Sequence, residues 1–246
     1  QAAGIPLDSI YLDIDYMERY KDFTVDQERF PDLGKLVQDM RTQGIRLVPI
    51  IDAGVKIETG YDVYQEGVAH NYFCKNAEGK DFVGAVWPGH VHFPDFLQPE
   101  ARDWFGKKYA VLTDLGIEGF WNDMNEPAIF YTEDRLAETC SEIQRLTAGN
   151  MGIDEYFAFT GMVAGLNGNK GDYDKFYHNV GGKLVKHSDV HNLYGMNMTR
   201  SAYEALREIC PDKRTLFFSR SSYIGAHRYG GIWQGDNKSW WSHILQ

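Results

Sequence analysis

The chain has 246 residues, of which 43% are hydrophobic and 14% aromatic, and its formal net charge at neutral pH is −10. This length and apolar content support a sizeable core in one large domain or two small ones, which excludes a disordered polymer. The negative charge repels phosphate groups, so we expect neither a nucleic acid nor an anionic membrane as a partner, whereas a neutral ligand is admissible.

Four short apolar or β-branched runs that end in polar residues predict β-strands. In chain order they are SIYLDID (9–15), IRLVPIID (45–52), IEGFWNDMN (117–125) and RTLFFSRSS (214–222). A shorter fifth candidate is GGIWQGD (230–236).

Helical stretches accompany these strands. They are predicted at residues 32–44, 99–116 and 192–211, and NKSWWSHILQ opens a fourth from residue 237. The first ends at Gly44, the second starts near Pro99 and ends at Gly116, and the third is closed by Pro211. Proline near a helix start and glycine just after its end are typical boundary signals.

The alternation of strands and helices predicts an α/β fold with parallel strands joined by crossovers. Strands that are apolar early and polar at their carboxyl ends are typical of a (β/α)₈ TIM barrel. An open doubly wound sheet is the alternative. The barrel is favoured because no glycine-rich phosphate loop follows the first strand and acids recur after several strands. Only about five strands are present, so this chain is expected to form an incomplete barrel.

Residues 1–246 are therefore predicted to be part of a single (β/α)₈ domain, with insertions at about 53–98 and 126–190. Both segments are too long for ordinary βα loops and are expected to lie over the site. The second contains AGLNGNKGDYD, whose glycine and asparagine residues favour a surface loop.

Charged side chains recur at the carboxyl ends of the predicted strands. Asp13 and Asp15 would point to opposite faces of the first strand, because side chains alternate along a strand. The later strands end in Asp52, Asp123, Arg220 and Asp236. Each acid taken alone is well explained as a helix cap or a partner of loop amides. As a set at one end of successive strands, these groups would ring a single pocket.

Such a ring suits carbohydrate chemistry. Two carboxylates on opposite sides of a sugar can hydrolyse a glycoside, one as nucleophile and one as acid and base. Flat apolar surface for a sugar ring is available from Trp87, Trp121, Trp233, Trp240 and Trp241. Core packing is the alternative, and we expect it for Trp104, which lies on a helix, and for one of Trp240 and Trp241.

Two segments carry a family resemblance. GFWNDMNEP (119–127) and RSSYIGAHRYGGIWQGDNKSWW (220–241) resemble the two catalytic signatures of glycoside hydrolase family 31, the α-glucosidase family. LDIDYMERYKDFT (12–24) and LVPIIDAGV (47–55) are similar to the first two barrel strands of that family. The resemblance covers nearly the whole chain and implies a (β/α)₈ barrel with additional β domains.

The resemblance implies three catalytic residues. Asp123 would be the nucleophile that forms a β-glycosyl-enzyme intermediate. Asp236 would be the general acid that protonates the leaving oxygen and then the base that activates water. Glu126 would be a supporting acid. The charge of Arg220 and the amides of Asn122 and Asn125 are candidates for keeping Asp123 ionised.

It also implies a set of substrate-binding residues. Asp13 would bind the 4-OH and 6-OH of the sugar in the −1 subsite, and Arg220 would bind a hydroxyl near the nucleophile. The walls of this subsite would be Trp121, Met124 and Trp233, with Ile14, Ile51 and Trp87 close by.

The proton of Asp236 needs burial or a negative neighbour, which Trp233, Trp240 and the charge of Asp123 would supply. A helix start after Asp236 would instead lower the pKa of its carboxyl group and so oppose the acid role. For a retaining mechanism the two carboxyl groups should lie about 5–5.5 Å apart, or somewhat further across a wide pocket.

The function implied is a retaining α-glycosidase, specifically an α-glucosidase, that removes terminal non-reducing α-linked glucose from neutral oligosaccharides without a cofactor. An α-xylosidase, a transglycosylase or a lyase on the same scaffold is an alternative, and so is a non-catalytic carbohydrate-binding fragment. The family's catalytic-site histidine beyond the second signature and its N-terminal β domain are not in this sequence. We therefore expect a segment of a longer enzyme.

Metal binding is not expected. His90 and His92 form an HxH pair, but no further ligand follows at a matching spacing. Cys74, Cys140 and Cys210 are scattered and form no CxxC pair, which favours reduced thiols. No apolar run approaches the ~18 residues of a membrane span. With no signal-like start, these features favour a cytoplasmic location.

Overall fold

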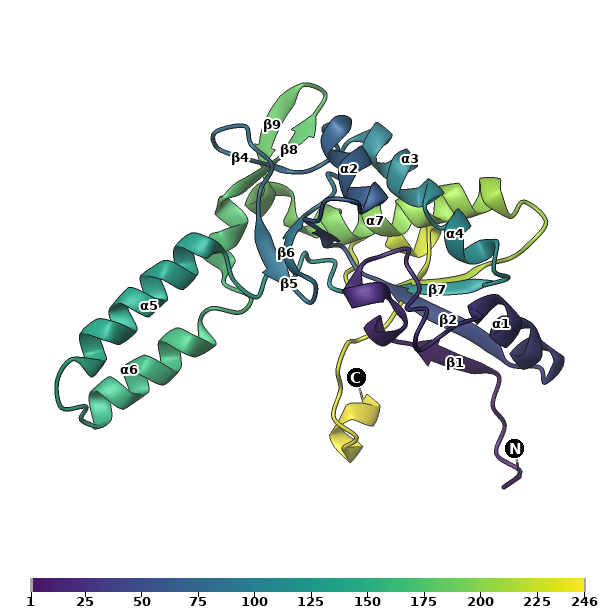
Figure 1. The fold of residues 1–246 in the computed structure, drawn as a ribbon, viewed down its shortest axis with the longest axis horizontal. Coiled ribbons are helices and arrows are strands. Elements are labelled where there is room, and N and C mark those ends of the chain that lie inside the picture. Colours follow the sequence, from purple (N-terminus) through teal and green to yellow (C-terminus); the bar gives the residue numbers. More distant parts are fainter. Residues whose placement is uncertain (1, 246) are drawn as a thin grey trace.

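The computed structural model describes residues 2–245. Its centre is a sheet of five parallel strands (Figure 1). They are β1 (Ser9–Leu12), β2 (Arg46–Ile51), β7 (Gly119–Asn122), β10 (Leu216–Ser219) and β11 (Gly231–Ile232). These match the five predicted strands, each somewhat shorter than its sequence run.

The order of strands in this sheet follows their order in the chain, β1-β2-β7-β10-β11. A doubly wound sheet reverses direction at a switch point, whereas a barrel adds each strand beside the preceding one. The unreversed order confirms the barrel topology. Within the described residues the sheet ends at β1 on one side and at β11 on the other, so the barrel is not closed.

Helices make the crossovers. They are α1 (Leu33–Thr42), α3 (Pro99–Lys107) with α4 (Ala110–Thr113), and α7 (His187–Ile209). The single helix expected over 99–116 is two helices, and the helix expected from 192 begins at His187. α3 and α7 pack closely, because a Cβ added to Gly106 would lie 2.5 Å from the carbonyl oxygen of Ser201. Only glycine permits this approach of the two backbones.

The connection after β1 differs from the expectation. β1 stops at Leu12, and Asp13 caps a 3₁₀ helix, η1 (Ile14–Tyr16), by accepting a 2.8 Å hydrogen bond from the Ile14 N–H. A second 3₁₀ helix, η2 (Glu18–Tyr20), follows. The alternation expected for Asp13 and Asp15 is therefore wrong, because the capping bond ends the strand before either residue.

Residues 53–98 form small elements at the carboxyl end of the large sheet. They are β3 (Val55–Lys56), α2 (Asp62–Ala69), β4 (Lys75–Asn76), β5 (Gly84–Val86) and β6 (Gly89–His92). Three of them pair antiparallel in the order β3-β6-β5. β4 joins a different sheet, β4-β8-β9, with strands from much later in the chain.

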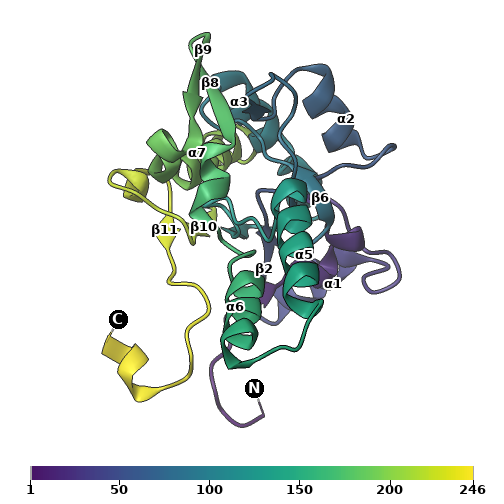
Figure 2. The same cartoon turned by 90° about the vertical axis from the view of Figure 1, so that its left-hand side faces the viewer.

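Residues 126–190 are more structured than a surface loop. They form α5 (Glu133–Thr147), α6 (Ile153–Ala164), the 3₁₀ helix η3 (Lys170–Asp174), β8 (Phe176–Val180) and β9 (Lys183–Lys186). α5 and α6 make a helical hairpin that projects away from the large sheet in Figure 1 and stands in front of the sheet, toward the viewer, in Figure 2. The surface-loop prediction is wrong for the hairpin, since the Gly- and Asn-rich stretch only follows α6.

The end of the chain also departs from prediction. The 3₁₀ helix η4 (Ala226–Arg228) precedes β11, and a short 3₁₀ helix, η5 (Trp241–Leu245), stands in place of the helix expected from residue 237. η5 lies away from the sheet (Figure 1). Trp240 and Trp241 are 62% and 88% exposed, so core packing of one of them is wrong. Trp104 is a core residue as expected, packed on Phe73 and Phe105. None of the described helices combines the length and apolarity that crossing a membrane requires.

Candidate active site

The register of the large sheet aligns the residues that follow its strands. Ile51 pairs with Asn122, Asn122 pairs with Ser219, and Ser219 pairs with Ile232. The next residue of each strand therefore lies in one row across the sheet. That row consists of Asp52, Asp123, Arg220 and Trp233.

Asp123 is held from two sides. Its Oδ1 accepts a 2.7 Å hydrogen bond from the Met124 N–H and lies 2.8 Å from Nη1 of Arg220. Burial raises the pKa of Asp123 to about 6, while the Arg220 charge and the Met124 N–H act in the opposite direction. At pH 7 most molecules therefore carry an ionised carboxylate that is only 8% exposed. This is the state that a carboxylate nucleophile requires.

Arg220 joins Asp123 to Glu126. Its Nε and Nη2 donate to the two carboxylate oxygens of Glu126 at 3.0 and 2.9 Å, and Ser221 Oγ donates to the same group at 2.8 Å. Burial raises the pKa of Glu126, but the hydrogen bonds and charge of Arg220, together with the Ser221 hydroxyl, outweigh it, so the pKa lies below its ordinary value. The structure thus makes Glu126 the fixed anionic partner of Arg220.

Met124 stands between the two acids in an unusual conformation. Its φ is +54°, in the left-handed region that non-glycine residues seldom adopt. This backbone aims the Met124 N–H at Asp123 and brings Sδ to 3.4 Å from Nη2 of Arg220. Backbone strain of this kind, held by surrounding contacts, is common at functional sites.

Asn122 and Asn125 do not support Asp123 as expected. Asn122 Oδ1 accepts from Tyr109 Oη at 2.7 Å, deep in the core. Asn125 Nδ2 donates to Ser219 Oγ at 2.8 Å, and its Oδ1 accepts from the Ser221 N–H at 3.1 Å. Asn122 therefore ties the end of β7 to Tyr109 beside α4, and Asn125 ties the segment after β7 to the end of β10.

Trp121 and Trp233 are brought together. Their rings meet edge to face with centroids 5.1 Å apart, and Trp121 Nε1 donates to the Leu12 carbonyl at 3.3 Å. Trp233 Nε1 is buried and has no hydrogen-bond partner among the described residues. The two rings form an apolar surface beside the row of strand ends.

The other predicted binding residues lie at different depths. Asp13 is exposed and Ile14 partly so, on the connection after β1. Ile51 is fully buried beneath the row, and its carbonyl accepts from the Asp123 N–H at 3.1 Å. Trp87 is 49% exposed at the turn between β5 and β6, against the rings of Phe130 and Tyr20.

Asp236 is exposed, four residues beyond the end of β11. Its charge raises the pKa of both Asp123 and Arg220, which places it within electrostatic reach of the site. The burial expected from Trp240 is absent, because that ring is itself largely exposed. The helix start expected to oppose the acid role is also absent, since the described chain forms only a 3₁₀ turn from Trp241.

A buried acid pair, Asp22 and Asp52, lies at the Asp52 end of the row. Asp22 Oδ1 accepts from the Asp52 N–H at 2.8 Å, and one oxygen of each carboxyl has no partner among the described residues. Burial, followed by the charge of Asp123, raises the pKa of Asp52 to about 8. Asp52 was expected at the pocket from its position at a strand end, whereas nothing in the pattern around Asp22 marked that residue.

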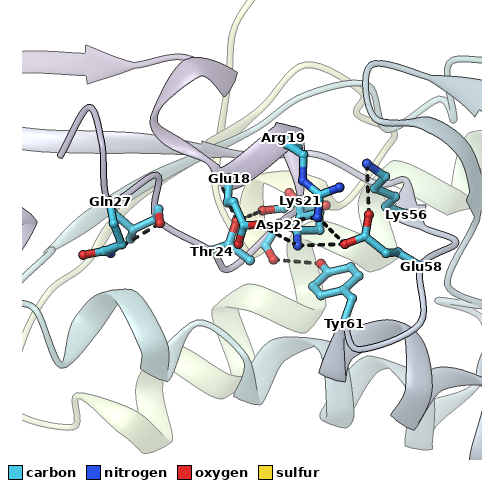
Figure 3. A network of polar contacts seen from close by, with 10 residues as sticks. Glu18, Arg19, Lys21, Asp22, Thr24, Gln27, Lys56, Glu58 and Tyr61 are labelled. Carbon is cyan, nitrogen blue, oxygen red and sulfur yellow. Dashed lines mark hydrogen bonds and ion pairs between the residues drawn. The ribbon is translucent and has the colours of Figure 1, made fainter. Parts of the chain in front are cut away.

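A charged cluster fixes the connection that carries Asp13 (Figure 3). Glu58 binds the ammonium group of Lys21 at 3.1 Å, that of Lys56 at 3.2 Å and the guanidinium of Arg19. The bond from Lys21, and then those from Lys56 and Arg19, lower the pKa of Glu58 to about 2. Arg19 has a φ of +52°, so the cluster holds a strained backbone in place.

The cavities only partly coincide with this site. One of about 350 Å³ lies beside Trp87, Tyr20 and Met17. Another, of about 840 Å³, lies between α7 and the β10–β11 edge, and no predicted site residue lines it. We place the site by the strand-end chemistry, because charged groups and aromatic rings converge there.

One cluster of described residues has the composition of a metal site. The ligand atoms of Cys74, Asp95 and His178 all lie within 4.8 Å of one another. The HxH pair does not take part: His92 Nδ1 lies 2.8 Å from the Phe82 carbonyl, and His90 pairs with Glu133.

Comparison with known proteins identifies relatives of this arrangement. The model of the "Glycosyl hydrolases family 31 TIM-barrel domain" matches residues 1–246. Alpha-glucosidase 2 of Bacillus thermoamyloliquefaciens is 40% identical over 98% of the chain, and an alpha-glucosidase of Mucor javanicus is 33% identical over 98%. The chain spans 26% and 31% of these two relatives.

Solved structures agree. The family 31 alpha-glucosidase of Bacteroides thetaiotaomicron is 30% identical, with a TM-score of 0.69, over 98% of this chain and 32% of that one. An ER glucosidase II heterodimeric complex of a catalytic subunit and the binding domain of a regulatory subunit is 28% identical, with a TM-score of 0.73. That match covers 98% of this chain and 22% of that one.

Proposed function

Because the chain belongs to glycoside hydrolase family 31, we propose that it carries the catalytic centre of a retaining α-glucosidase. The reaction is hydrolysis of terminal non-reducing α-linked glucose from neutral oligosaccharides through a covalent glycosyl-enzyme intermediate. No cofactor takes part.

The observation that carries this proposal is the environment of Asp123. A nearly buried carboxylate with a pKa of about 6 follows β7 and is held by Arg220 and the Met124 N–H. Such a group is ionised at neutral pH and fixed in direction, as attack on an anomeric carbon demands. Glu126 supports it indirectly by fixing the guanidinium of Arg220.

In this proposal Asp236 is the acid and base. Its charge acts on Asp123 across the open side of the site, where a leaving group and water have access. The position four residues beyond β11 leaves it free to approach a bound sugar. The separation of about 5–5.5 Å that a retaining mechanism requires stays a prediction for the bound state.

The sugar itself is held by the surrounding residues. Trp121, Met124 and Trp233 form the wall beside the nucleophile, and Asp13 offers a carboxylate to hydroxyl groups at the β1 side. Ile14 and Trp87 border the same side, and Ile51 supports the floor from below. The named relatives are α-glucosidases, which favours glucose as the substrate. A cytoplasmic location stays a prediction.

The test is Asp123→Asn in the full-length protein, assayed with a nitrophenyl α-glucoside. We expect kcat to fall by at least about a thousandfold, because an amide cannot form the covalent intermediate. Asp15→Asn is the control, since Asp15 is an exposed surface partner of Arg29 on the connection after β1. Hydrolysis by the Asp123 variant at the wild-type rate would refute the nucleophile assignment.

The alternatives are separated by substrate and product. Comparison of aryl glucoside with aryl xyloside distinguishes an α-glucosidase from an α-xylosidase, and product analysis identifies transfer or lyase chemistry. Titration calorimetry that detects sugar binding by a full-length protein without turnover would favour a non-catalytic carbohydrate-binding protein.

A further inference from the structure

Four side chains from three separate segments form a continuous polar chain behind the site. His178 Nδ1 lies 2.7 Å from Asp95 Oδ1, and His178 Nε2 lies 2.9 Å from His187 Nδ1. His187 Nε2 in turn lies 2.9 Å from His191 Nδ1. Asp95, His178 and His187 are at most 1% exposed, and His191 is partly exposed. The histidine chain, as we call these four residues, runs from the core toward the surface.

The partners of Asp95 set the direction of its hydrogen bonds. The carboxylate accepts from the Asn179 N–H at 2.7 Å, and from the Leu97 N–H and Gln98 Nε2 at 3.2 Å each. Because its other three partners are all donors, the Asp95 carboxylate also accepts in its fourth hydrogen bond, the one with His178. His178 Nδ1 therefore carries a proton.

The remaining protons follow from the two-sided chemistry of a neutral imidazole, which donates from one nitrogen and accepts at the other. With Nδ1 of His178 protonated, its Nε2 accepts from His187 Nδ1. His187 Nε2 then accepts from His191 Nδ1. Every ring N–H in the histidine chain therefore points toward Asp95. Nε2 of His191 is left as an acceptor.

His187 and His191 have the surroundings of neutral groups. Burial, and then the neighbouring His178 and His191, lower the pKa of His187 to about 2. Burial also lowers the pKa of His191. Phe176 stacks on His187 with centroids 4.3 Å apart, and the Tyr173 ring lies 4.6 Å from that of His191.

At the inner end of the histidine chain, a bound metal ion fits the geometry less well than a direct hydrogen bond does. Cys74 Sγ is 3.5 Å from His178 Nδ1, so a Cys–Asp–His set is conceivable. Tetrahedral zinc holds ligands about 2.0–2.2 Å away, which separates two of them by roughly 3.3 Å. The 2.7 Å between His178 and Asp95 is instead a direct hydrogen bond. Burial also raises the pKa of the Cys74 thiol, which keeps it protonated.

The outer half of the histidine chain faces the loop that carries the candidate nucleophile. His187, His191 and Gly195 are spaced by four residues and therefore share one face of α7. A Cβ on Gly195 would lie 2.8 Å from the Asn125 carbonyl oxygen and 2.5 Å from Ser221 Cβ. A backbone group of Glu126 also interacts with the His187 ring and acts to raise its pKa. This face of α7 thus supports the segments that hold Glu126 and Arg220.

We propose that Asp95, His178, His187 and His191 are positioning residues, whose aligned hydrogen bonds fix α7 against the nucleophile loop and so set the Glu126–Arg220–Asp123 geometry. The inference deepens the proposed function and rests on it for its kinetic effect. The proton positions are independent of any activity.

Neutron diffraction from deuterium-exchanged crystals of the full-length protein tests the proton positions. We expect deuterons on Nδ1 of all three histidines and none on their Nε2 atoms. A deuteron on Nε2 of His187 or His191 would overturn the inference, and so would zinc bound stoichiometrically at Cys74, Asp95 and His178 in elemental analysis of the same protein.

Kinetics test the positioning role. His187→Leu removes both hydrogen bonds, and we expect kcat to fall about tenfold or more with KM changed less than about threefold, because small displacements of reacting groups slow catalysis strongly. His187→Gln keeps one donor and one acceptor and should recover most of kcat. His92→Leu is the matched control, since His92 is a buried histidine that does not belong to the histidine chain.

The outcomes are distinguishable. Equal losses of kcat in His187→Leu and His92→Leu would overturn the positioning role. So would a folded His187→Gln variant that recovers none of the lost kcat. If the wild-type protein hydrolyses no α-glucoside, the proposed function fails. In that case deuterons on Nδ1 of all three rings would still establish the aligned chain, and any on Nε2 of His187 or His191 would exclude it.

Discussion

At the residue scale, Asp123 and Glu126 look alike in the sequence, as two acids three positions apart in one motif. The structure separates them through Arg220. Glu126 receives two hydrogen bonds from the guanidinium, whereas Asp123 shares one nitrogen and remains beside the open end of the sheet. The pKa of Glu126 is lowered and that of Asp123 is raised, so the two acids suit different roles.

The pH dependence of activity follows from this arrangement. Since Asp123 has a pKa of about 6 and must be ionised, kcat/KM should fall below about pH 6. The charge of Arg220 lowers that pKa, so Arg220→Gln should move the acid limb to higher pH by about one unit, besides lowering the maximal rate. Arg29→Gln, at an exposed surface pair, should leave the limb in place. An acid limb at lower pH in the Arg220 variant would contradict the assignment.

Asp52 gives a prediction for stability. Its pKa is about 8 in the folded protein and near 4 when unfolded, so the folded state binds more protons between these values. The contribution of Asp52 is therefore greatest below about pH 4 and is lost as pH rises toward 8, by up to about 1.4 kcal/mol per pH unit. The thermal unfolding temperatures of the wild-type protein at pH 5 and pH 8 measure this loss of stability.

Asp52→Asn should flatten that dependence and raise the unfolding temperature at pH 8 more than at pH 5. Asp39→Asn, at an exposed pair with Lys35, is the control, and its unfolding temperature should differ from that of the wild type by about the same amount at both pH values. An Asp52 variant that loses stability more steeply than the wild type as pH rises would contradict the raised pKa.

At the element scale, the helices that cover the sheet are fixed by close backbone contacts. Gly106→Ala places a methyl group 2.5 Å from the Ser201 carbonyl oxygen on α7. We expect a loss of about 1–3 kcal/mol in the free energy of unfolding, because overpacking forces the helices apart. Chemical denaturation measures the change.

Gly161→Ala in α6 is the matched control. A Cβ there meets nothing within 4 Å, and alanine favours helix more than glycine does. This variant should gain about 0.5–1 kcal/mol. If both glycine variants changed stability in the same direction, the close contact of α3 with α7 would not be the cause.

The segments between the barrel strands show what element prediction missed. β4 has two residues and pairs with β8, about a hundred positions later in the chain. Such short strands carry no readable alternation, and their existence depends on the partner strand. α5 was missed although it begins with acidic residues, because neighbouring glycine- and asparagine-rich sequence dominated the interpretation of the whole segment.

At the scale of the whole molecule, the unreversed strand order is the central feature. It brings residues 52, 123, 220 and 233 into one row although they are far apart in the chain. Alternation of strands and helices predicted parallel strands, and the recurrence of acids predicted that they meet. Both inferences used only local patterns. The first agrees with the sheet, and the second holds for Asp52 and Asp123, which share the row, whereas Asp13 and Asp236 lie outside it.

The net charge of −10 gives a prediction at this scale. A neutral substrate is not steered by the field of the protein, so kcat/KM for a neutral nitrophenyl α-glucoside should change less than about twofold between low and high salt. A glucoside with a cationic aglycone is the control and should lose rate as salt screens the attraction. A steep salt dependence with the neutral substrate would show that charge controls binding.

The sequence by itself determined the strand segments, the barrel class, and the acids and tryptophans that follow the strands. These features are local, because periodicity and boundary residues act within a few positions. Only the tertiary structure decided that Arg220 binds both Asp123 and Glu126, that Asp22 lies beneath Asp52, and that the histidine chain supports α7. Those relations join segments tens of residues apart, and burial, which shifts the pKa of each group, exists only once the chain has packed.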